Sequence, residues 1–393
     1  MGEFWGTVRE ELVTEVFWIV LGILIGTILN IIFRRVVKMY RRNRRKKEME
    51  LNKNNFLETR NILSLDHADP HYELQDISVK DTGKNLYIGF PSELLDEIRE
   101  LDPNFDIRSS VSFDQETDFR NLEDLTGIAG LAQMIQMHKI QVAREFIQLI
   151  GEGRTLFNGT KYGVYRIKPG RTSDEKENSS LRIELFKTDY FTHRVFRSIY
   201  KELVNQNHPI GEVRKFEELH KYYPFLTSFG MNTFVLLDNG DDIEIIFAKR
   251  SKYISKQESE SLWHVTMNEG LTGTDKDGKD VSLIKCLHRG LQEELGIRVE
   301  HHRFIEEEYF MDLFLEKESF EIGITSYVKL NMDLNQIKQL YIGAQDAELE
   351  TDALEAVDLS SKKIKKFLEN NKLTPAAEYT LNMLLARQRS LGN

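Results

Sequence analysis

The sequence has one cysteine, Cys286, so no disulfide bond can form within the chain. It is also short of positive charge, because 53 lysines and arginines face 63 aspartates and glutamates, a formal net charge of −10. Nine positive charges and no acid lie in residues 34–47; subtracting their +9 from −10 leaves −19 for the remainder. So acidic a remainder argues against nucleic acid as a partner of the soluble part.

One long apolar run lies near the N-terminus. It spans Val16–Phe33, and its only polar members are Thr27 and Asn30. As a helix its eighteen residues reach about 27 Å, close to the thickness of a bilayer core. The run lacks the marks of a cleavable signal peptide, because the positive residues follow it and no small-x-small site comes after it. We therefore predict a single transmembrane helix over residues 16–33.

The charges on either side of this run predict its orientation. Residues 1–15 hold Arg9 and four glutamates, whereas residues 34–47 hold nine lysines and arginines. By the positive-inside rule the N-terminus faces out and the C-terminal part is cytoplasmic. The basic residues also suit anionic lipid headgroups, so membrane lipids are an expected partner.

Three residues form a stripe on the predicted membrane helix. Gly22, Gly26 and Asn30 are spaced four residues apart, so they share one face. A G-x-x-x-G pair allows two backbones to approach closely, and Asn30 could hydrogen-bond across such a contact. This predicts a homo-oligomer, although glycine is common in membrane helices without any such role.

After a basic juxtamembrane segment and linker, residues 34–72, the chain is expected to form a mixed α/β region over residues 73–227. The patterns indicate strands at residues 86–90, 162–167 and 181–186, a helix at 93–101 and an extended helix within 122–150.

A short polar segment in this region could bind a ligand. Asp189, Tyr190, His193 and Arg194 lie at the start of an expected helix. Helix N-termini attract anions, and Tyr190, His193 and Arg194 could stack on or clamp a phosphorylated base. The alternative is a capped helix with Thr188 or Asp189 as its N-cap and His193 on the surface.

The C-terminal part, residues 228–387, shows a regular order of elements. Strands are expected at 233–237 and 243–248, with an Asn-Gly turn between them, and then at 263–265, 309–315 and 323–330. The segments 352–359 and 360–370 and an amphipathic run that begins at Thr374-Pro375-Ala376 and ends at Arg387 complete it.

The segment from Arg289 to Ile297 resembles the second half of a Nudix box, Arg-Glu-U-x-Glu-Glu-x-Gly-U, where U is aliphatic. Six of its seven checkable positions agree, and Gly290 stands where the family has its first glutamate. Upstream, Val281 and Asp275 replace the family's glutamate and glycine. The resemblance implies an α/β/α sandwich, so the predicted fold class is α/β (α+β). It also implies candidate site residues: Mg²⁺ ligands Glu293 and Glu294, and ligand-binding residues Trp263, Asn268, Glu269 and Arg289.

The glycine at position 290 weakens the metal site that the resemblance implies. Clustered carboxylates on one helix face hold Mg²⁺ in the family, and here that cluster is one ligand short. Glycine within a helix costs about 1 kcal/mol relative to alanine, so we expect another backbone or a ligand to approach closely there. The pattern favours a domain that binds a nucleotide without cutting it. A plain solvated helix face is the alternative for Glu293 and Glu294.

The whole arrangement resembles the membrane-anchored Nudix-like effectors of CBASS, the cyclic-oligonucleotide antiphage systems of bacteria. The resemblance rests on the single membrane helix and on the pattern Trp263, Asn268-Glu269-Gly270 and Arg289-Gly290-Leu291. It implies a protein of the bacterial inner membrane that senses a cyclic oligonucleotide and then disrupts that membrane. No cofactor is required, and Mg²⁺ is an optional ion.

Two other functions remain open. One is a membrane-tethered, Mg²⁺-dependent hydrolase of nucleoside diphosphate compounds, with Glu293, Glu294 and either Glu269 or Glu300 as metal ligands. The other is a non-catalytic protein whose Nudix-like domain docks a partner.

Overall fold

The computed structural model describes residues 62–64, 77–108, 113, 119–154, 156–171, 179–214, 216–238, 240, 242–251, 262–278, 280–345 and 351–390. The predicted membrane helix (residues 16–33), its stripe of Gly22, Gly26 and Asn30, and the basic segment 34–47 lie outside the described residues. Within the described ranges, no helix is both long and apolar enough to cross a bilayer.

The larger of two sheets has eight strands, and six of them follow the order β1-β11-β12-β5-β6-β13. Two short strands join it, β7 beside β6 and β8 beside β5. Their bounds are β1 Ile62–Ser64, β5 Phe229–Asp238, β6 Ile243–Arg250, β7 Trp263–His264, β8 Met267–Gly270, β11 Ile305–Glu316, β12 Glu321–Leu330 and β13 Thr351–Asp358. All strands predicted in this part are present, including the β5–β6 hairpin, in which Val235 faces Ile246.

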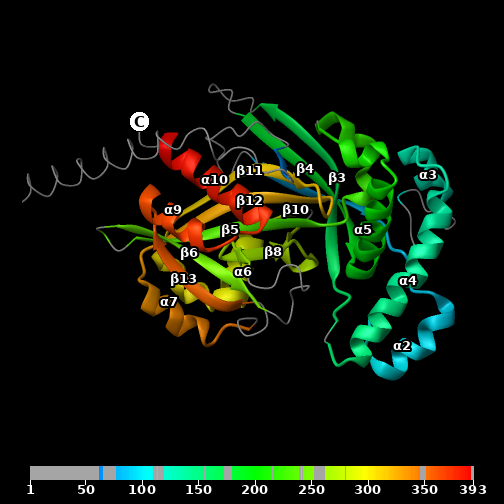
Figure 1. The fold of residues 1–393 in the computed structure, drawn as a ribbon, viewed down its shortest axis with the longest axis horizontal. Coiled ribbons are helices and arrows are strands. Elements are labelled where there is room, and N and C mark those ends of the chain that lie inside the picture. The colour runs from blue at the N-terminus through cyan, green and yellow to red at the C-terminus, as the bar shows by residue number, and fades with distance from the viewer. Residues whose placement is uncertain are drawn as a thin grey trace, which may run out of the picture.

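Helices cover both faces of this sheet (Figure 1). On one face lie α6 (Leu283–Leu295) and α7 (Leu334–Tyr341); on the other lie α9 (Ser361–Asn370) and α10 (Pro375–Ser390). Successive strand residues pack alternately into the two cores: Val235 lies on the α6 side and Leu236 on the α10 side. Period-two alternation thus buries both faces, and the predicted mixed α/β class is confirmed.

The smaller sheet has the order β3-β4-β2-β10-β9. Its strands are β2 Ile77–Asn85, β3 Thr160–Arg171, β4 Ser179–Asp189, β9 Lys276–Asp277 and β10 Asp280–Val281. Helix α5 (Tyr190–Asn205) packs beside β4, and α4 (Leu131–Gly151) packs on α5 (Figure 1). Because β10 pairs with β2, the segment just before α6 belongs to the smaller sheet. The chain therefore passes from the smaller sheet directly into α6, which packs on the larger sheet.

Two predictions in the middle region are wrong. The extended helix expected within residues 122–150 is two helices, α3 (Arg120–Thr126) and α4, because Gly127 and Gly130 adopt left-handed conformations between them. The strand expected at 86–90 is absent, since β2 ends at Asn85. The expected helix at 93–101 is present as a 3-10 turn, Ser92–Leu94, followed by α2 (Leu95–Leu101).

Candidate functional site

The helix that carries the box residues is held at both ends. Ser282 caps α6 by accepting a hydrogen bond from the backbone N–H of Lys285. At the other end Gly296 adopts a φ of 71°, and a Cβ there would overlap the carbonyl oxygen of Leu340 in α7. Only glycine satisfies both the left-handed backbone and this close approach. The glycine of the box pattern therefore fixes where α6 stops.

Arg289 projects from α6 into three carboxylates. Its Nε and Nη2 donate to the two oxygens of Asp275, both at 3.0 Å, in a bidentate pair. Its Nη1 donates to Glu269 at 2.7 Å and to Glu293 at 2.9 Å. Its Nη2 also donates to the carbonyl oxygen of Gly270 at 2.8 Å. These bonds use all five N–H groups of a guanidinium, so Arg289 ties α6 to β8 and to the loop before β9.

The surroundings keep this guanidinium charged. Burial alone would lower the pKa of Arg289, but the hydrogen bonds that it donates to Asp275 and the charge of Glu269 raise it above its ordinary value. The Asp275 side chain is 1 % exposed and that of Glu269 is 13 % exposed. A charged group so enclosed is stable only while it is paired. We call Arg289 with Glu269, Asp275 and Glu293 the Arg289 cluster, and it stabilises the packing of α6 on β8.

Gly290 lies against strand β8. A Cβ on this residue would overlap the Met267 sulfur and lie 2.5 Å from the Glu269 Cγ. The close approach expected at Gly290 is thus made by side chains of β8. Any larger side chain, including the family's glutamate, requires these two residues to move.

The two predicted metal ligands have other partners. Glu293 pairs with Arg289, and the Glu294 carboxylate, which is buried, accepts a hydrogen bond from the Asn268 backbone N–H at 3.0 Å. Glu300 is exposed in the 3-10 turn Val299–Phe304, beyond the end of α6. Across the described residues no three His, Cys, Asp or Glu side chains are placed to hold a metal ion. In this arrangement Arg289 and the Asn268 backbone engage the two carboxylates, and Glu293 and Glu294 as Mg²⁺ ligands stay a prediction.

The other predicted residues of this part lie on either side of the sheet. Trp263 is buried against Phe367, and its indole N–H donates to Asn371 at 2.9 Å, so it holds the loop after α9. Asn268 lies on β8, and its side-chain amide donates to Asn232 of β5 at 2.7 Å. Of the four predicted ligand-binding residues here, the structure brings together Glu269 and Arg289, while the Asn268 side chain lies on the other face of β8 and Trp263 packs in the opposite core.

The start of α5 is fully capped. Asp189 accepts the backbone N–H of Thr192 at 2.8 Å, Asn158 accepts that of Phe191 at 2.7 Å, and Gly159 accepts that of Tyr190 at 3.2 Å. The first three donors of the helix are therefore used within the protein. Asp189 is buried, and burial raises the pKa of its carboxyl. The N-cap expected in the alternative interpretation of this segment is present.

The side chains that follow Asp189 differ in exposure. His193 is buried rather than on the surface, with Nδ1 3.0 Å from the Thr227 hydroxyl and Nε2 3.5 Å from Glu321. Burial lowers the pKa of His193, which the nearby Glu321 only partly offsets. Tyr190 and Arg194 are partly exposed, and the Arg194 guanidinium lies 5.9 Å from the Tyr190 ring centre. Tyr190 and Arg194 are thus the members of this group that a ligand could reach.

Lys161 on β3 was missed in the sequence and links the two candidate groups. Its Nζ lies 5.9 Å from the centre of the Tyr190 ring and 3.8 Å from the position of a Cβ on Gly270, the last residue of β8. With the other described residues Lys161 forms no ion pair. Sequence patterning could not identify it, because its neighbours come from distant parts of the chain.

A second missed contact joins the smaller sheet to the Arg289 cluster. Lys276, next to Asp275, pairs at 2.6 Å with Asp81 of β2, which also lies 3.7 Å from Lys187 and accepts the Tyr162 hydroxyl at 3.2 Å. Burial raises the pKa of Asp81, but Lys276 and the Gly83 N–H outweigh this and lower it. The position of Asp275 therefore depends on both sheets.

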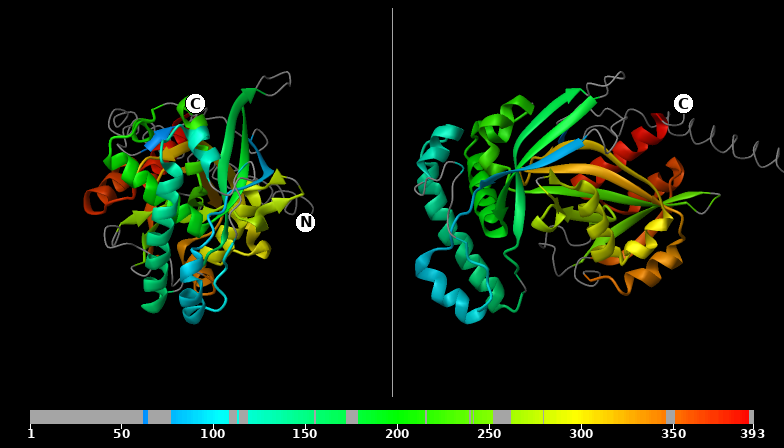
Figure 2. Two further views of the ribbon diagram at one scale, coloured as in Figure 1. Left: turned by 90° about the vertical axis from the view of Figure 1, so that its right-hand side faces the viewer. Right: turned by 180° about the vertical axis from the view of Figure 1, so that it is seen from behind.

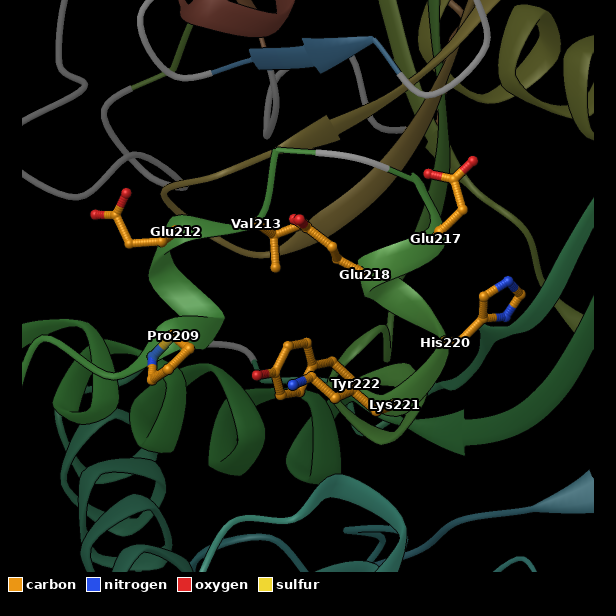
Figure 3. A pocket seen from close by; sticks show the side chains of 8 residues that line it. All are labelled: Pro209, Glu212, Val213, Glu217, Glu218, His220, Lys221 and Tyr222. Carbon is orange, nitrogen blue, oxygen red and sulfur yellow. The ribbon is translucent and has the colours of Figure 1, made fainter.

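Figure 3 shows a surface pocket of about 510 Å³. It is formed by the 3-10 turns Pro209–Glu212 and Phe216–Lys221. Its lining includes three glutamates, one lysine and none of the predicted site residues: Pro209, Glu212, Val213, Glu217, Glu218, His220, Lys221 and Tyr222.

No protein-family model matches the sequence, and no curated protein matches it. Solved structures of Nudix proteins do. The Nudix domain of Shewanella oneidensis NrtR, complexed with ADP ribose, is 11% identical, covering 41% of this chain and 87% of that chain, with a TM-score of 0.24. A C. elegans Ap4A hydrolase is 13% identical, covering 41% and 94%, with a TM-score of 0.24. A mutT/nudix family protein from Listeria innocua is 15% identical, covering 42% and 92%, with a TM-score of 0.26.

Proposed function

We propose that this chain is a membrane-anchored sensor whose Nudix-like part binds a cyclic oligonucleotide without cleaving it and then acts through its membrane helix. The observation that carries the proposal is the Arg289 cluster. The residues that match the box are bonded to one another: Arg289 to Glu293, Glu269 and Asp275, and Glu294 to the β8 backbone. A box arranged in this way maintains the fold rather than holding Mg²⁺ against a diphosphate.

Binding without cleavage also fits Gly290. A glutamate there would have to displace Met267 and Glu269 of β8, so the missing metal ligand cannot be supplied without repacking the strand. Glycine at position 290 is therefore required by the packing of Met267 and Glu269 against α6.

The ligand surface that we favour lies between β3, the start of α5 and the end of β8. Lys161 supplies positive charge there, Arg194 is held beside it by a 3.0 Å ion pair with Glu145, and the Tyr190 ring can stack on a base. A lysine beside an aromatic ring, with no ion pair among the described residues, suits an anionic ligand. Residues from both sheets meet at this surface, so a ligand bound there would contact both.

The membrane step requires several copies of the chain, because one helix cannot line a pore. A ligand favours the clustered form only if it binds that form more tightly than the dispersed form. Tethering then raises the local concentration of the helices, so a weak contact through Gly22, Gly26 and Asn30 becomes sufficient. In a bacterium this clustering would damage the inner membrane.

The first experiment separates binding from hydrolysis. The full chain in detergent is titrated by calorimetry with a panel of cyclic di- and trinucleotides, and separately incubated with Mg²⁺ and ADP-ribose or dinucleoside polyphosphates. We expect binding of a cyclic nucleotide that weakens about tenfold or more in Lys161→Gln, since charge-assisted hydrogen bonds contribute about 1.5–3 kcal/mol. Lys201→Gln, which removes an exposed lysine at the far end of α5, should leave affinity unchanged. Mg²⁺-dependent hydrolysis that disappears in Glu293→Gln would instead support the hydrolase.

The second experiment tests the membrane step. Gly22→Leu with Gly26→Leu separates the backbones of packed helices while keeping the run apolar. The double variant should bind the cyclic nucleotide as the parent does but no longer release a dye from vesicles. Undiminished leakage would place the toxic step elsewhere.

A further inference from the structure

One face of the smaller sheet carries a cluster of exposed positive side chains. Arg182 lies 3.1 Å, Lys168 3.1 Å and Arg166 4.0 Å from the carboxylate of Glu184, and the three basic side chains are 49 %, 45 % and 42 % exposed. Lys80 of β2, also exposed, is the cross-strand neighbour of Glu184. We call Lys80, Arg166, Lys168 and Arg182 the basic sheet face.

Strand register places these side chains together. Arg166 pairs with Glu184 and Lys168 with Arg182 across the β3–β4 hairpin. The intervening positions, Ile167 and Ile183, pair with each other and are buried. Because side chains alternate across a sheet, Ile167 and Ile183 lie on the buried face and the basic side chains on the opposite face.

The charge of this face is not explained by stability. Ion pairs with side chains this exposed contribute little to folding, yet four cations surround Glu184, and Asp280 lies opposite Lys80. The chain outside residues 34–47 has a formal charge of −19, so its composition does not account for a net positive face. Such a face suits an anionic partner.

The segment that precedes the sheets indicates the partner. Strand β2 begins in this half of the sheet, where Ile77 pairs with Leu181 and Ser78 with Arg182. The β3–β4 hairpin extends clear of the helices there (Figure 2). Upstream of β1, residues 34–61 connect to the predicted membrane helix; at about 3.5 Å per residue they span at most about 100 Å, enough for the basic sheet face to reach the bilayer.

We propose that the basic sheet face docks on anionic lipid headgroups of the membrane in which the chain is anchored. The proposal rests on the anchor of the proposed function. Phosphate groups accept hydrogen bonds from arginine and lysine, and Tyr165, with Lys84 at 5.1 Å and Arg166 at 5.5 Å from its ring centre, provides an aromatic group at the edge of this face. Docking sets the orientation of the cytoplasmic part relative to the bilayer.

The test uses the full chain in vesicles with an environment-sensitive dye on Ser78→Cys. Ser78 is exposed beside Arg182, and the native Cys286 is buried, so labelling is selective. In vesicles of phosphatidylcholine with phosphatidylglycerol we expect dye emission to rise and spin-labelled lipid to quench it. In phosphatidylcholine alone neither should occur. Raising salt from about 0.1 to 1 M shortens the screening length from about 10 to 3 Å and should release the face.

Removing basic charges and removing the acidic charge should change the affinity for anionic vesicles in opposite directions. Arg166→Gln, Lys168→Gln and Arg182→Gln together should weaken docking about a hundredfold, and Glu184→Gln alone should strengthen it several-fold, since each charge near an anionic surface acts similarly. The matched control removes three exposed lysines of α9, which lies beside β13 at the far edge of the larger sheet: Lys362, Lys363 and Lys365. This control should dock normally.

Each other outcome overturns the proposal. Equal quenching in neutral and anionic vesicles, full quenching in the triple variant, loss in the α9 control, or a dye response to RNA without vesicles would each do so. Alkaline carbonate extraction reports the anchor separately. A chain that is extracted lacks the membrane anchor of the proposed function, whereas a chain that is retained without quenching lacks only the docking.

Discussion

Replacing Gly290 by alanine tests how α6 packs on β8. Two effects oppose each other. Alanine is favoured over glycine in a helix by about 1 kcal/mol, but its Cβ would overlap Met267 Sδ and crowd Glu269 Cγ. Overpacking a filled interior costs about 1–3 kcal/mol. We therefore expect the free energy of unfolding to fall by roughly 0–2 kcal/mol.

The cost depends on which neighbour can move. The Met267 side chain ends in a flexible thioether, which adapts at low cost. Glu269 is less free, because its carboxylate is bonded to Arg289 at 2.7 Å. Moving Glu269 would disturb the whole cluster, so we expect the contact with Glu269 to dominate.

The matched control is Gly151→Ala, at the last residue of α4. No atom lies within 4 Å of a Cβ there, and its backbone is helical. It should be neutral or stabilising by up to about 1 kcal/mol. The difference between the two variants isolates the contact with β8, about 1–3 kcal/mol.

The assay is thermal unfolding of both variants, where 1 kcal/mol shifts the midpoint of a domain of 150–250 residues by roughly 2–4 °C. Gly290→Ala should unfold several degrees below Gly151→Ala. If it unfolds at the same temperature or above, then β8 yields without cost and the packing explanation for Gly290 is refuted.

Three further predictions concern groups around α6 and α5. Arg289→Met should destabilise the protein by about 3–5 kcal/mol, because it leaves the Asp275 carboxylate buried without its cationic partner; urea unfolding measures this, and a loss under about 1 kcal/mol would contradict it. Since the pKa of Asp81 is lowered in the folded state, its contribution is present above its unfolded pKa of about 3.9 and is lost as pH falls further. The stability difference between the parent and Asp81→Asn should thus be full at pH 7 and shrink below about pH 4, whereas a difference independent of pH would exclude an ionic role. Asp189→Ala should cost about 0.5–2 kcal/mol through loss of the α5 cap, and an unchanged melting temperature would show the cap to be dispensable.

Local patterns in the sequence predict much of the fold. The Asn-Gly turn and the alternating strands beside it identify the β5–β6 hairpin, since turn type and side-chain period are properties of neighbouring residues. The N-cap at Asp189 was one of two alternatives. It is predictable because its hydrogen bond joins residues only three apart in the sequence, Asp189 and Thr192. The failure at residues 122–150 has a similar origin. Helical periodicity continued through Gly127 and Gly130, but their left-handed backbones end one helix and start the next.

The sequence by itself determined the apolar run at 16–33, the acidic balance of the rest and the departure at Gly290. The tertiary structure decided what that departure means, because Met267 and Glu269 come within reach of Gly290 only when β8 pairs with β5. It also assembled the Arg289 cluster, the contact of Lys276 with Asp81, and the basic sheet face. Each of these depends on strand register and on contacts between residues far apart in the chain, which periodicity along the chain does not encode.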